Sequence, residues 1–438
     1  MFPIYDIESA KKTILKRTSL STMTYPASVM ERTAQLFGAG ITPQDAVARI
    51  LASVQKEGDE ALKKWGGLID HTGIKEFRIP LKEIERAHSS LSEDLLTAMQ
   101  TAADRIRRFH EHQPVPNWET FEMGGRLGQR VSSIECVGVY VPGGTAPLPS
   151  SLLMSVIPAQ VAGVRTIVIC TPPHPHPSIL GAAYLCGIDQ IYQLGGAQAI
   201  AALTFGTESV PKVNKIVGAG NLFVTLAKQQ VYGLVGLDGL SGPTETLVIA
   251  DQSAKPSWVA ADLLAQAEHD VLASAILITP DISLAQSVQN EVFKQMENLT
   301  RNEIIAQSLV NRSGIVLAPD IETACLLASD YAAEHTCLAV ADPQNIAGLI
   351  HNTGGLFLGE HSFEVLGDYI AGPSHVMPTG GTAHFASPLN VLDFIKITSI
   401  IALDENTSRE LSQTASIIAR AEGLTAHASA ADFRSFSS

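Results

Sequence analysis

The feature that most constrains this fold is a repeated alternation of short apolar runs with longer amphipathic stretches. The stretches at 151–163, 256–270 and 283–296 space their apolar residues as helices that cover a sheet do. Strands that alternate with such helices predict a mainly parallel α/β architecture. The predicted strands are residues 134–141, 166–171, 190–194, 215–217, 246–250, 275–279, 314–317, 337–340 and 356–358.

Length and charge limit the domain count and the class of partner. The 438 residues exceed the usual size of one hydrophobic core, so we expect at least two domains. A net charge of −14 argues against a nucleic-acid or anionic-membrane partner, because either would favour a basic face. No segment resembles a membrane span or the apolar core of a signal peptide. We therefore expect a cytoplasmic protein that binds neither nucleic acid nor membrane.

Neither the cysteines nor the glycines form a motif that identifies a site. The five cysteines are widely scattered and include no CxxC pair, which is typical of reduced thiols packed as small apolar side chains. None of the glycine-rich turns reads GxGxxG. If the chain binds NAD, it does so without that phosphate-binding turn.

One helix-like segment carries side chains that could hold a metal ion. Gln266 and His269 lie three residues apart on one helical face, with Asp262 one turn earlier. Asp368 and His427 are candidate distant partners, and this mixture of amide, imidazole and carboxylate suits zinc with open positions for a substrate. Taken singly, an exposed polar face, a capping acid and a surface histidine explain these residues better.

Glu334 and His335 are adjacent, between a helix-like segment at 322–331 and the strand predicted at 337–340. Such a pair can divide two proton transfers. Removing a hydride from an alcohol needs a base for the hydroxyl proton, which an imidazole supplies near neutral pH. Oxidising an aldehyde also needs an activated water, for which a carboxylate is suitable. Adjacent polar residues are common by chance, so the pair alone is a weak indication.

Taken together, these segments resemble the histidinol dehydrogenase family over nearly the whole chain. The order and spacing of the similar stretches are highly specific. The stretches are 137–144 (VGVYVPGG), 195–203 (GGAQAIAAL), 242–245 (GPTE), 263–270, 334–335, 367–379 and 422–427.

The resemblance implies an NAD-dependent enzyme that oxidises L-histidinol through L-histidinaldehyde to L-histidine, the last steps of histidine biosynthesis. His335 is then the principal catalytic base, and Glu334 is the catalytic group that activates water. The residues that match NAD contacts in the family are Tyr140, Gln198 and Asn221.

The resemblance also implies one zinc ion per active site and an intertwined homodimer whose other subunit supplies His427. Zinc would serve as a template that orients the substrate beside the nicotinamide. The zinc ligands would be Gln266, His269, Asp368 and His427. The substrate contacts would be Thr244, Gln266, His269, Glu334, His335, Asp368, His375, Glu422 and His427.

We expect two Rossmann-like three-layer domains, each a parallel sheet with helices on both faces, and small helical N- and C-terminal extensions. The first domain would carry zinc and the catalytic residues, and the second would bind NAD. The expected parts are an N-terminal and linker extension (1–29 with 390–399), the first α/β domain (30–138 with 244–389), the second α/β domain (139–243) and a C-terminal small domain that reaches the partner subunit (400–438).

Several positions near the expected site depart from the family pattern. Thr336 and Cys337 stand where Leu-Glu is usual, and Ala333 replaces a proline before the acid and imidazole. Thr244 stands where serine is usual, and Ala219 replaces a proline in a glycine turn. These changes bear on substrate identity and kinetic competence more than on metal or fold.

Two alternatives stay open beside histidinol oxidation. One is a related dehydrogenase with the same zinc and NAD apparatus that acts on another small alcohol, such as a sulfonated diol. An oxidation that does not depend on an imidazole ring in the substrate would favour it. The other is a non-catalytic zinc- or nucleotide-binding relative, which a lack of NADH formation by zinc-loaded protein would favour. The complete ligand set and both proton-transfer residues favour histidinol.

Overall fold

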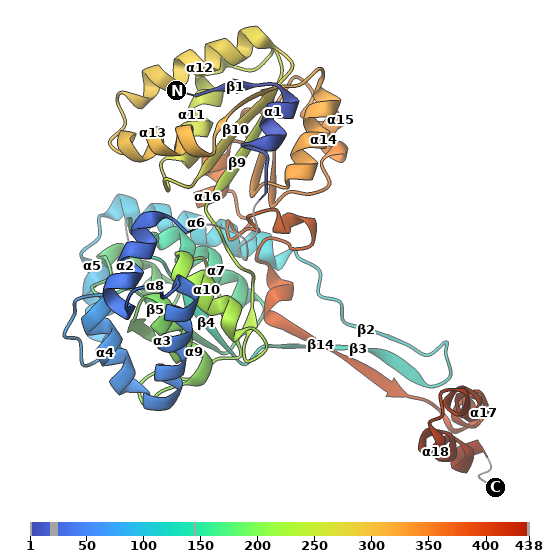
Figure 1. Cartoon of the computed structure of the whole chain (residues 1–438). Coiled ribbons are helices and arrows are strands. Elements are labelled where there is room, and N and C mark those ends of the chain that lie inside the picture. The colour runs from blue at the N-terminus through green and yellow to red at the C-terminus, as the bar shows by residue number, and fades with distance from the viewer. Residues whose placement is uncertain (1, 18–24, 144–145, 436–438) are drawn as a thin grey trace. The chain divides into compact units, whose positions relative to one another are not determined.

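The chain divides into two compact units, which are described separately (Figure 1). The structure is a computed structural model, and it describes residues 2–17, 25–143 and 146–435. Unit 1 comprises Met1–His112 and Glu135–Asp393, and unit 2 comprises Gln113–Ile134 and Phe394–Ser438. Unit 1 contains two parallel sheets flanked by helices, which confirms the expected α/β fold.

The first sheet of unit 1 has six parallel strands with helices on both faces. Every residue of its two central strands β9 and β10 is buried, as a sheet covered on both faces requires. Its order is β1 (Ile4–Tyr5), β11 (Gly314–Leu317), β10 (Ser274–Thr279), β9 (Glu245–Ala250), β12 (His335–Ala339) and β13 (Gly355–Leu358). Figure 1 shows α11 (Pro256–Ala267), α12 (Ile282–Met296) and α13 (Asn302–Asn311) on one face, with α1 (Ile7–Lys12), α14 (Ile321–Tyr331) and α15 (Pro343–Ile346) on the other.

The second sheet of unit 1 has five parallel strands. The first strand in the chain, β4, lies in the middle, so the connections leave it toward β5 on one side and β7 on the other. Ligands bind at such a switch point in many open α/β sheets. The order is β6 (Ile191–Gln193), β5 (Thr166–Thr171), β4 (Cys136–Tyr140), β7 (Lys215–Val217) and β8 (Gly236–Leu237). The flanking helices are α7 (Pro149–Val161), α8 (Pro177–Leu185), α9 (Gly196–Phe205) and α10 (Leu222–Val231).

The N-terminal helices pack on the five-stranded side, which differs from the division expected from the sequence. Val47, Ile50 and Leu62 share one hydrophobic core with Val168 of β5 and Ile200 of α9. The sequence instead predicts that residues 30–138 belong with residues 244–389. An apolar stripe on a helix predicts that the helix covers a core, but it does not identify which core. The helices are α2 (Ala27–Phe37), α3 (Pro43–Glu57), α4 (Asp59–Ile69), α5 (Leu81–Ser89) and α6 (Glu93–Glu111).

Unit 2 is a three-stranded antiparallel sheet followed by two helices that pack against each other. The helices match the expected C-terminal helical extension, but the sheet was not predicted. Most residues of its strand β14 are exposed, so the strand lacks the continuous apolar run of the buried strands. The strands run in the order β14 (Ile395–Ala402), β3 (Arg126–Ser133) and β2 (Trp118–Thr120), and the helices are α17 (Glu405–Ala421) and α18 (Thr425–Ser435).

Three further observations bear on the sequence predictions. The five cysteines are free thiols, and all except the half-buried Cys136 are buried, as expected. Burial raises the pKa of the Cys186 thiol to about 12, which makes it a poor nucleophile. Among the described residues, no helix is both long and apolar enough to cross a membrane. The remaining short helices are η1 (Ala347–Leu349), α16 (Glu364–Tyr369), η2 (Thr382–His384) and η3 (Val391–Phe394).

Candidate active site

A cavity of about 170 Å³ lies where the amino ends of β9 and β12 meet the loops of the five-stranded sheet. Ala219, which follows β7, lines it together with Thr244, which precedes β9. Seven residues predicted from the sequence line this cavity: Thr244, Gln266, His269, Glu334, His335, Asp368 and His375. In the six-stranded sheet the cavity is at the amino edge, opposite to the carboxyl edge that α/β sheets usually use.

The register of two neighbouring strands places the acid and the imidazole side by side with the start of β9. His335 pairs with Thr246 in the parallel ladder, so Glu334 comes to lie beside Glu245. Gly354, just before β13, lies against the Glu334 backbone, where a Cβ atom would be 2.5 Å from the Glu334 carbonyl oxygen. This close approach requires glycine at position 354.

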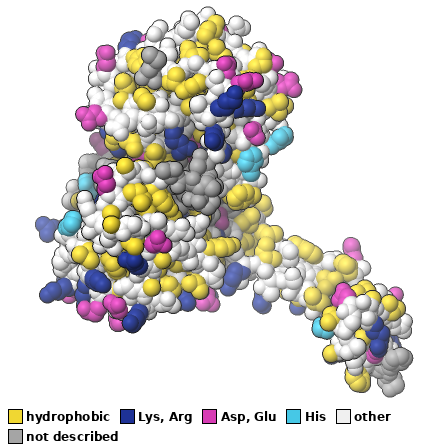
Figure 2. Space-filling view, viewed as in Figure 1, with side chains coloured by type: hydrophobic (Ala, Val, Ile, Leu, Met, Phe, Trp, Pro, Cys, Tyr) yellow, Lys and Arg dark blue, Asp and Glu magenta, His cyan; other side chains and the backbone are white. Residues whose placement is uncertain are grey.

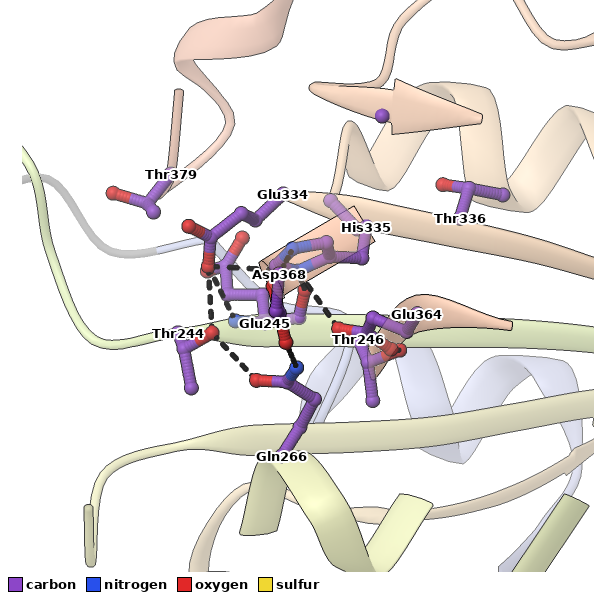
Figure 3. A network of polar contacts seen from close by, with 12 residues as sticks. Thr244, Glu245, Thr246, Gln266, Glu334, His335, Thr336, Glu364, Asp368 and Thr379 are labelled. Atoms are coloured by element: carbon purple, nitrogen blue, oxygen red, sulfur yellow. Dashed lines mark hydrogen bonds and ion pairs between the residues drawn. The ribbon is translucent and has the colours of Figure 1, made fainter. Parts of the chain in front are cut away.

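Glu334 is a buried carboxyl group held by two donors. The Thr244 hydroxyl donates to its Oε2 at 2.7 Å, and the backbone N–H of Glu245 donates to the same atom at 3.2 Å (Figure 3). Burial raises the pKa of Glu334 to about 7, although the neighbouring His335 and the Thr244 hydrogen bond oppose the rise. A carboxyl group with this pKa can take up and release a proton near neutral pH.

His335 is surrounded by carboxylates and is almost fully buried. Its Nδ1 lies 2.9 Å from Glu364 Oε1, and its Nε2 lies 3.4 Å from Asp368 Oδ1. Burial alone would lower the pKa of the imidazole, but the carboxylates of Glu364 and Glu334 outweigh burial and raise that pKa well above its usual value. The carboxylates therefore stabilise the protonated form of the ring at the cavity wall.

Glu364 is a site residue that the sequence analysis missed. It is fully buried on α16, and the Thr246 hydroxyl donates to its Oε2 at 2.6 Å. Its other oxygen, Oε1, faces the imidazole and forms the ion pair with His335 Nδ1. Glu364 and Asp368 are four residues apart on one helix and so share a face, and this spacing is the signal that could have identified it.

Asp368 links the imidazoles to the Gln266 amide. Gln266 Nε2 lies 3.0 Å from Asp368 Oδ2, and Gln266 Oε1 lies 3.0 Å from the Thr244 hydroxyl oxygen. Burial favours the neutral form of Asp368, but hydrogen bonding to His335 and the charge of that ring outweigh burial and lower the pKa of the carboxyl group. The ligand atoms of His335, Glu364 and Asp368 lie within 4.8 Å of one another, so they could together hold a cation.

His375 closes the cavity on the side of the five-stranded sheet. Its Nδ1 lies 2.6 Å from the Asp368 carbonyl oxygen, and its Nε2 lies 3.1 Å from the Ser151 hydroxyl oxygen. Burial lowers the pKa of His375, so the ring is neutral at neutral pH and acts by hydrogen bonding.

The residues predicted to contact NAD lie at the carboxyl edge of the five-stranded sheet and are not among the residues that line the cavity. Tyr140 ends β4, and its hydroxyl accepts a hydrogen bond from the Gly196 N–H at 3.2 Å. Gln198 Nε2 donates to Asp70 at 2.9 Å, while Gln198 Oε1 is buried with no partner within the described chain. Asn221 caps α10 and is exposed.

Glu422 and His427 belong to unit 2, where both are exposed. Their roles as substrate and zinc contacts stay predictions. The unusual residues after Glu334 and His335, Thr336 and Cys337, do not line the cavity. The Thr336 hydroxyl accepts a hydrogen bond from Thr353 at 2.8 Å, and Cys337 Sγ lies 3.9 Å from Glu364.

Comparison with known proteins identifies the family. A profile described as Histidinol dehydrogenase matches residues 40–435. A protein named Histidinol dehydrogenase from Thermus thermophilus is 49% identical over 393 residues, covering 90% of this chain and 95% of that protein. The protein of the same name from Deinococcus radiodurans is 48% identical over 426 residues, covering 96% of this chain and 97% of that protein. The crystal structure of histidinol dehydrogenase from Elizabethkingia anophelis superposes with a TM-score of 0.90 at 35% identity, covering 99% of this chain and 98% of that chain. The chain therefore belongs to the histidinol dehydrogenase family and is an oxidoreductase.

Proposed function

We propose that this enzyme oxidises L-histidinol to L-histidine in two NAD-dependent steps, with L-histidinaldehyde as the intermediate. One observation carries the proposal: Glu334 and His335 are adjacent, buried and held by different partners at one cavity wall. An alcohol-to-acid oxidation needs a proton acceptor and an activated water, and this pair can supply both.

Each step is assigned to one side chain. In the first step His335, in its neutral form, would take the hydroxyl proton, and NAD, when bound, would supply the acceptor for the hydride of the alcohol carbon. Glu334 would then take a proton from the water that adds to the aldehyde, which gives the anion of the hydrate. Loss of a hydride from that anion leaves the carboxylic acid, and a second NAD, when bound, would supply the acceptor. The pKa of Glu334, about 7, suits proton uptake at neutral pH.

The residues around Asp368 fit a zinc ion. With the Gln266 amide oxygen toward Thr244, the hydroxyl of Thr244 would have to donate its one hydrogen both to Glu334 and to Gln266 Oε1. Turning the Gln266 amide over removes this conflict. The amide oxygen then faces the Asp368 carboxylate, an arrangement that a cation would stabilise.

We assign zinc to Gln266, His269 and Asp368, with His427 of a second subunit as the fourth ligand. When bound, zinc would orient the substrate. The cluster of His335, Glu364 and Asp368 offers a different donor set, but zinc on His335 would occupy the catalytic base. Metal analysis separates the two sets. Asp368→Asn should lose zinc whichever set binds it. His335→Asn should retain zinc only if His335 is not a zinc ligand.

We place NAD at the switch point of the five-stranded sheet, in contact with Tyr140, Gln198 and Asn221. Tyr140 ends β4, and Asn221 follows β7, the two strands on either side of the reversal. The buried, unpartnered Gln198 Oε1 is an acceptor that a ligand donor would satisfy.

We propose that the enzyme is a homodimer with shared sites, and the surface of unit 2 supports this. In α17 the buried residues are Ser412, Ser416 and Ala419, whereas Ile417 and Ile418 are 69% and 54% exposed. Figure 2 shows hydrophobic side chains in yellow on this helix pair. Small residues inside and large apolar residues outside are typical of a surface that another chain covers.

The test is NADH formation by the zinc-loaded protein with L-histidinol, compared with His335→Asn. We expect two NADH per histidinol, and a loss of about 10²-fold to 10⁴-fold in kcat for the variant. Glu334→Gln should instead slow mainly the aldehyde step. Turnover of another small alcohol, such as a sulfonated diol, in preference to histidinol would identify a related dehydrogenase. No NADH from any alcohol would favour a non-catalytic relative.

A further inference from the structure

We propose that Arg17, in the N-terminal segment, is a positioning residue that fixes the starts of β9 and β12 and thereby aligns Glu334 and His335. Arg17 follows α1 and lies in the part of the chain that precedes the family match at residues 40–435. The proposal rests on the proposed function of the catalytic pair.

The Arg17 guanidinium contacts the start of β9 and the end of α14, which leads into β12, at once. One NH group pairs with the carboxylate of Glu245, the first residue of β9. The Nε atom donates to the Tyr331 carbonyl oxygen at 2.8 Å, and the other terminal nitrogen donates to the carbonyl oxygens of Tyr331 and Ala332. The guanidinium carbon also lies 3.5 Å from the centre of the Tyr331 ring. A planar fork of five donors makes this combination possible, and a lysine could not reproduce it.

On the β9 side, Arg17 holds the residue whose backbone touches both members of the catalytic pair. The N–H of Glu245 donates to Glu334 Oε2 at 3.2 Å, and its carbonyl oxygen lies 3.4 Å from His335 Nδ1. The Glu245 side chain is 3% exposed, so Arg17 neutralises a buried carboxylate there. Without Arg17 that carboxylate would be buried and unpaired, and moving it toward water would displace the backbone that orients the pair.

On the β12 side, Arg17 secures the turn that leads into the pair. Helix α14 ends at Tyr331, and its C-cap residue Ala332 has a left-handed conformation with φ of 51° and lies two residues before Glu334. A residue other than glycine is strained in this conformation and keeps it only where contacts hold it. Arg17 also satisfies carbonyl groups that the helix end leaves without intrahelical partners.

The experiment compares Arg17→Met with Lys16→Met, its exposed neighbour, in the zinc-loaded full chain. We expect Arg17→Met to lower kcat by about 10²-fold, the scale of a misplaced catalytic group, with less than threefold change in KM for histidinol and NAD and with full zinc content. Lys16→Met should match the wild type. Arg17→Lys should stay nearly as slow as Arg17→Met, because it keeps the charge but loses the fork.

Guanidinium rescue and hydrogen exchange distinguish a positioning role of Arg17 from a loss of stability and from a failure of the proposed function. The Arg17 side chain is 23% exposed, so guanidinium ion can enter the space that Arg17→Ala leaves. Millimolar guanidinium should raise the kcat of Arg17→Ala at least tenfold. Hydrogen exchange of the backbone at 332–336 should be faster in Arg17→Met than in Lys16→Met, whichever alcohol the enzyme oxidises. Unchanged exchange together with no guanidinium rescue would overturn the proposal. If the wild type does not oxidise histidinol but the two variants still differ in hydrogen exchange, the proposed substrate is wrong and the positioning role of Arg17 stands.

Discussion

Lys228 and Asp238 are buried against each other, 2.5 Å apart, and together they bind both backbone polar groups of Gly218. Asp238 Oδ2 accepts from the Gly218 N–H at 2.7 Å, and Lys228 Nζ donates to the Gly218 carbonyl at 3.0 Å. Gly218 has φ of 103° and begins the turn that carries Ala219 into the cavity and leads to Asn221. The ion pair thus sets the backbone of the proposed cofactor turn.

The Lys228–Asp238 ion pair should affect NAD binding separately from its effect on the free energy of unfolding. Lys228→Met alone should lower the free energy of unfolding by about 3 to 5 kcal/mol, because it leaves the Asp238 charge buried and unpaired. The double variant Lys228→Met with Asp238→Met should recover most of that loss. KM for NAD should nevertheless rise about tenfold in the double variant while KM for histidinol stays constant. An unchanged KM for NAD would show that the turn does not need the pair.

Thr244 should affect catalysis through its hydroxyl rather than its shape. Thr244→Val removes the donor to Glu334, and hydrogen bonds to charged groups contribute about 1.5 to 3 kcal/mol. We therefore expect kcat to fall about 10-fold to 100-fold in Thr244→Val. Thr244→Ser keeps the hydroxyl and should stay within about twofold of the wild type. Steady-state kinetics with zinc-loaded proteins decides this, and equal activity of the valine and serine variants would contradict it.

Asp262 should make the protein less stable as the pH rises. Burial raises the pKa of its carboxyl group to about 7, and the carboxylates of Glu364 and Glu360 add to the rise. The folded protein therefore keeps a proton that the unfolded chain loses near pH 4, so stability falls as the pH increases through 7. Asp262→Asn should gain on the order of 2 kcal/mol over the wild type between pH 4 and pH 8.

Denaturant unfolding at a series of pH values measures this difference. Glu303→Gln, at an exposed site on α13, serves as the control and should follow the wild-type profile. A constant difference between Asp262→Asn and the wild type across the range would refute the assignment.

Shared sites should show themselves by complementation. His427→Asn and His335→Asn should each be nearly inactive, and mixing them under conditions that exchange subunits should restore about a quarter of the wild-type activity, as one intact site per mixed dimer requires. Ile417→Asp, on the exposed face of α17, should dissociate the dimer and lose activity, whereas Asn406→Asp should do neither. Light scattering reports the mass, and no recovery after verified exchange would argue for self-contained sites.

The buried parallel strands could be predicted from the sequence because both of their faces are covered. β5, β7 and β11 begin and end at the predicted residues, since a strand buried on both faces is a continuous apolar run. β14 could not be found in this way. Its burial pattern shows an exposed strand whose partner, β3, lies more than 250 residues earlier in the chain.

The residues of the candidate site also differ in whether the sequence could predict them. Residues within a recognisable motif, such as Glu334 and His335, were predicted, and the cavity brings them together with Asp368. Glu364 and Arg17 were missed because each acts through a residue distant in sequence: Glu364 through His335, and Arg17 through Glu245. The helical spacing of Glu364 and Asp368 indicates a shared face but not the partner on it, and both partners become visible only in the tertiary contacts.

The inverted burial of α17, with serine and alanine inside and isoleucine outside, has a consequence for how this enzyme should be assayed. A chain that leaves such a face to a second copy has a threshold concentration below which its sites are incomplete. Its specific activity should then depend on dilution, and preparations compared at nanomolar and micromolar enzyme would appear to differ in quality when they differ only in assembly.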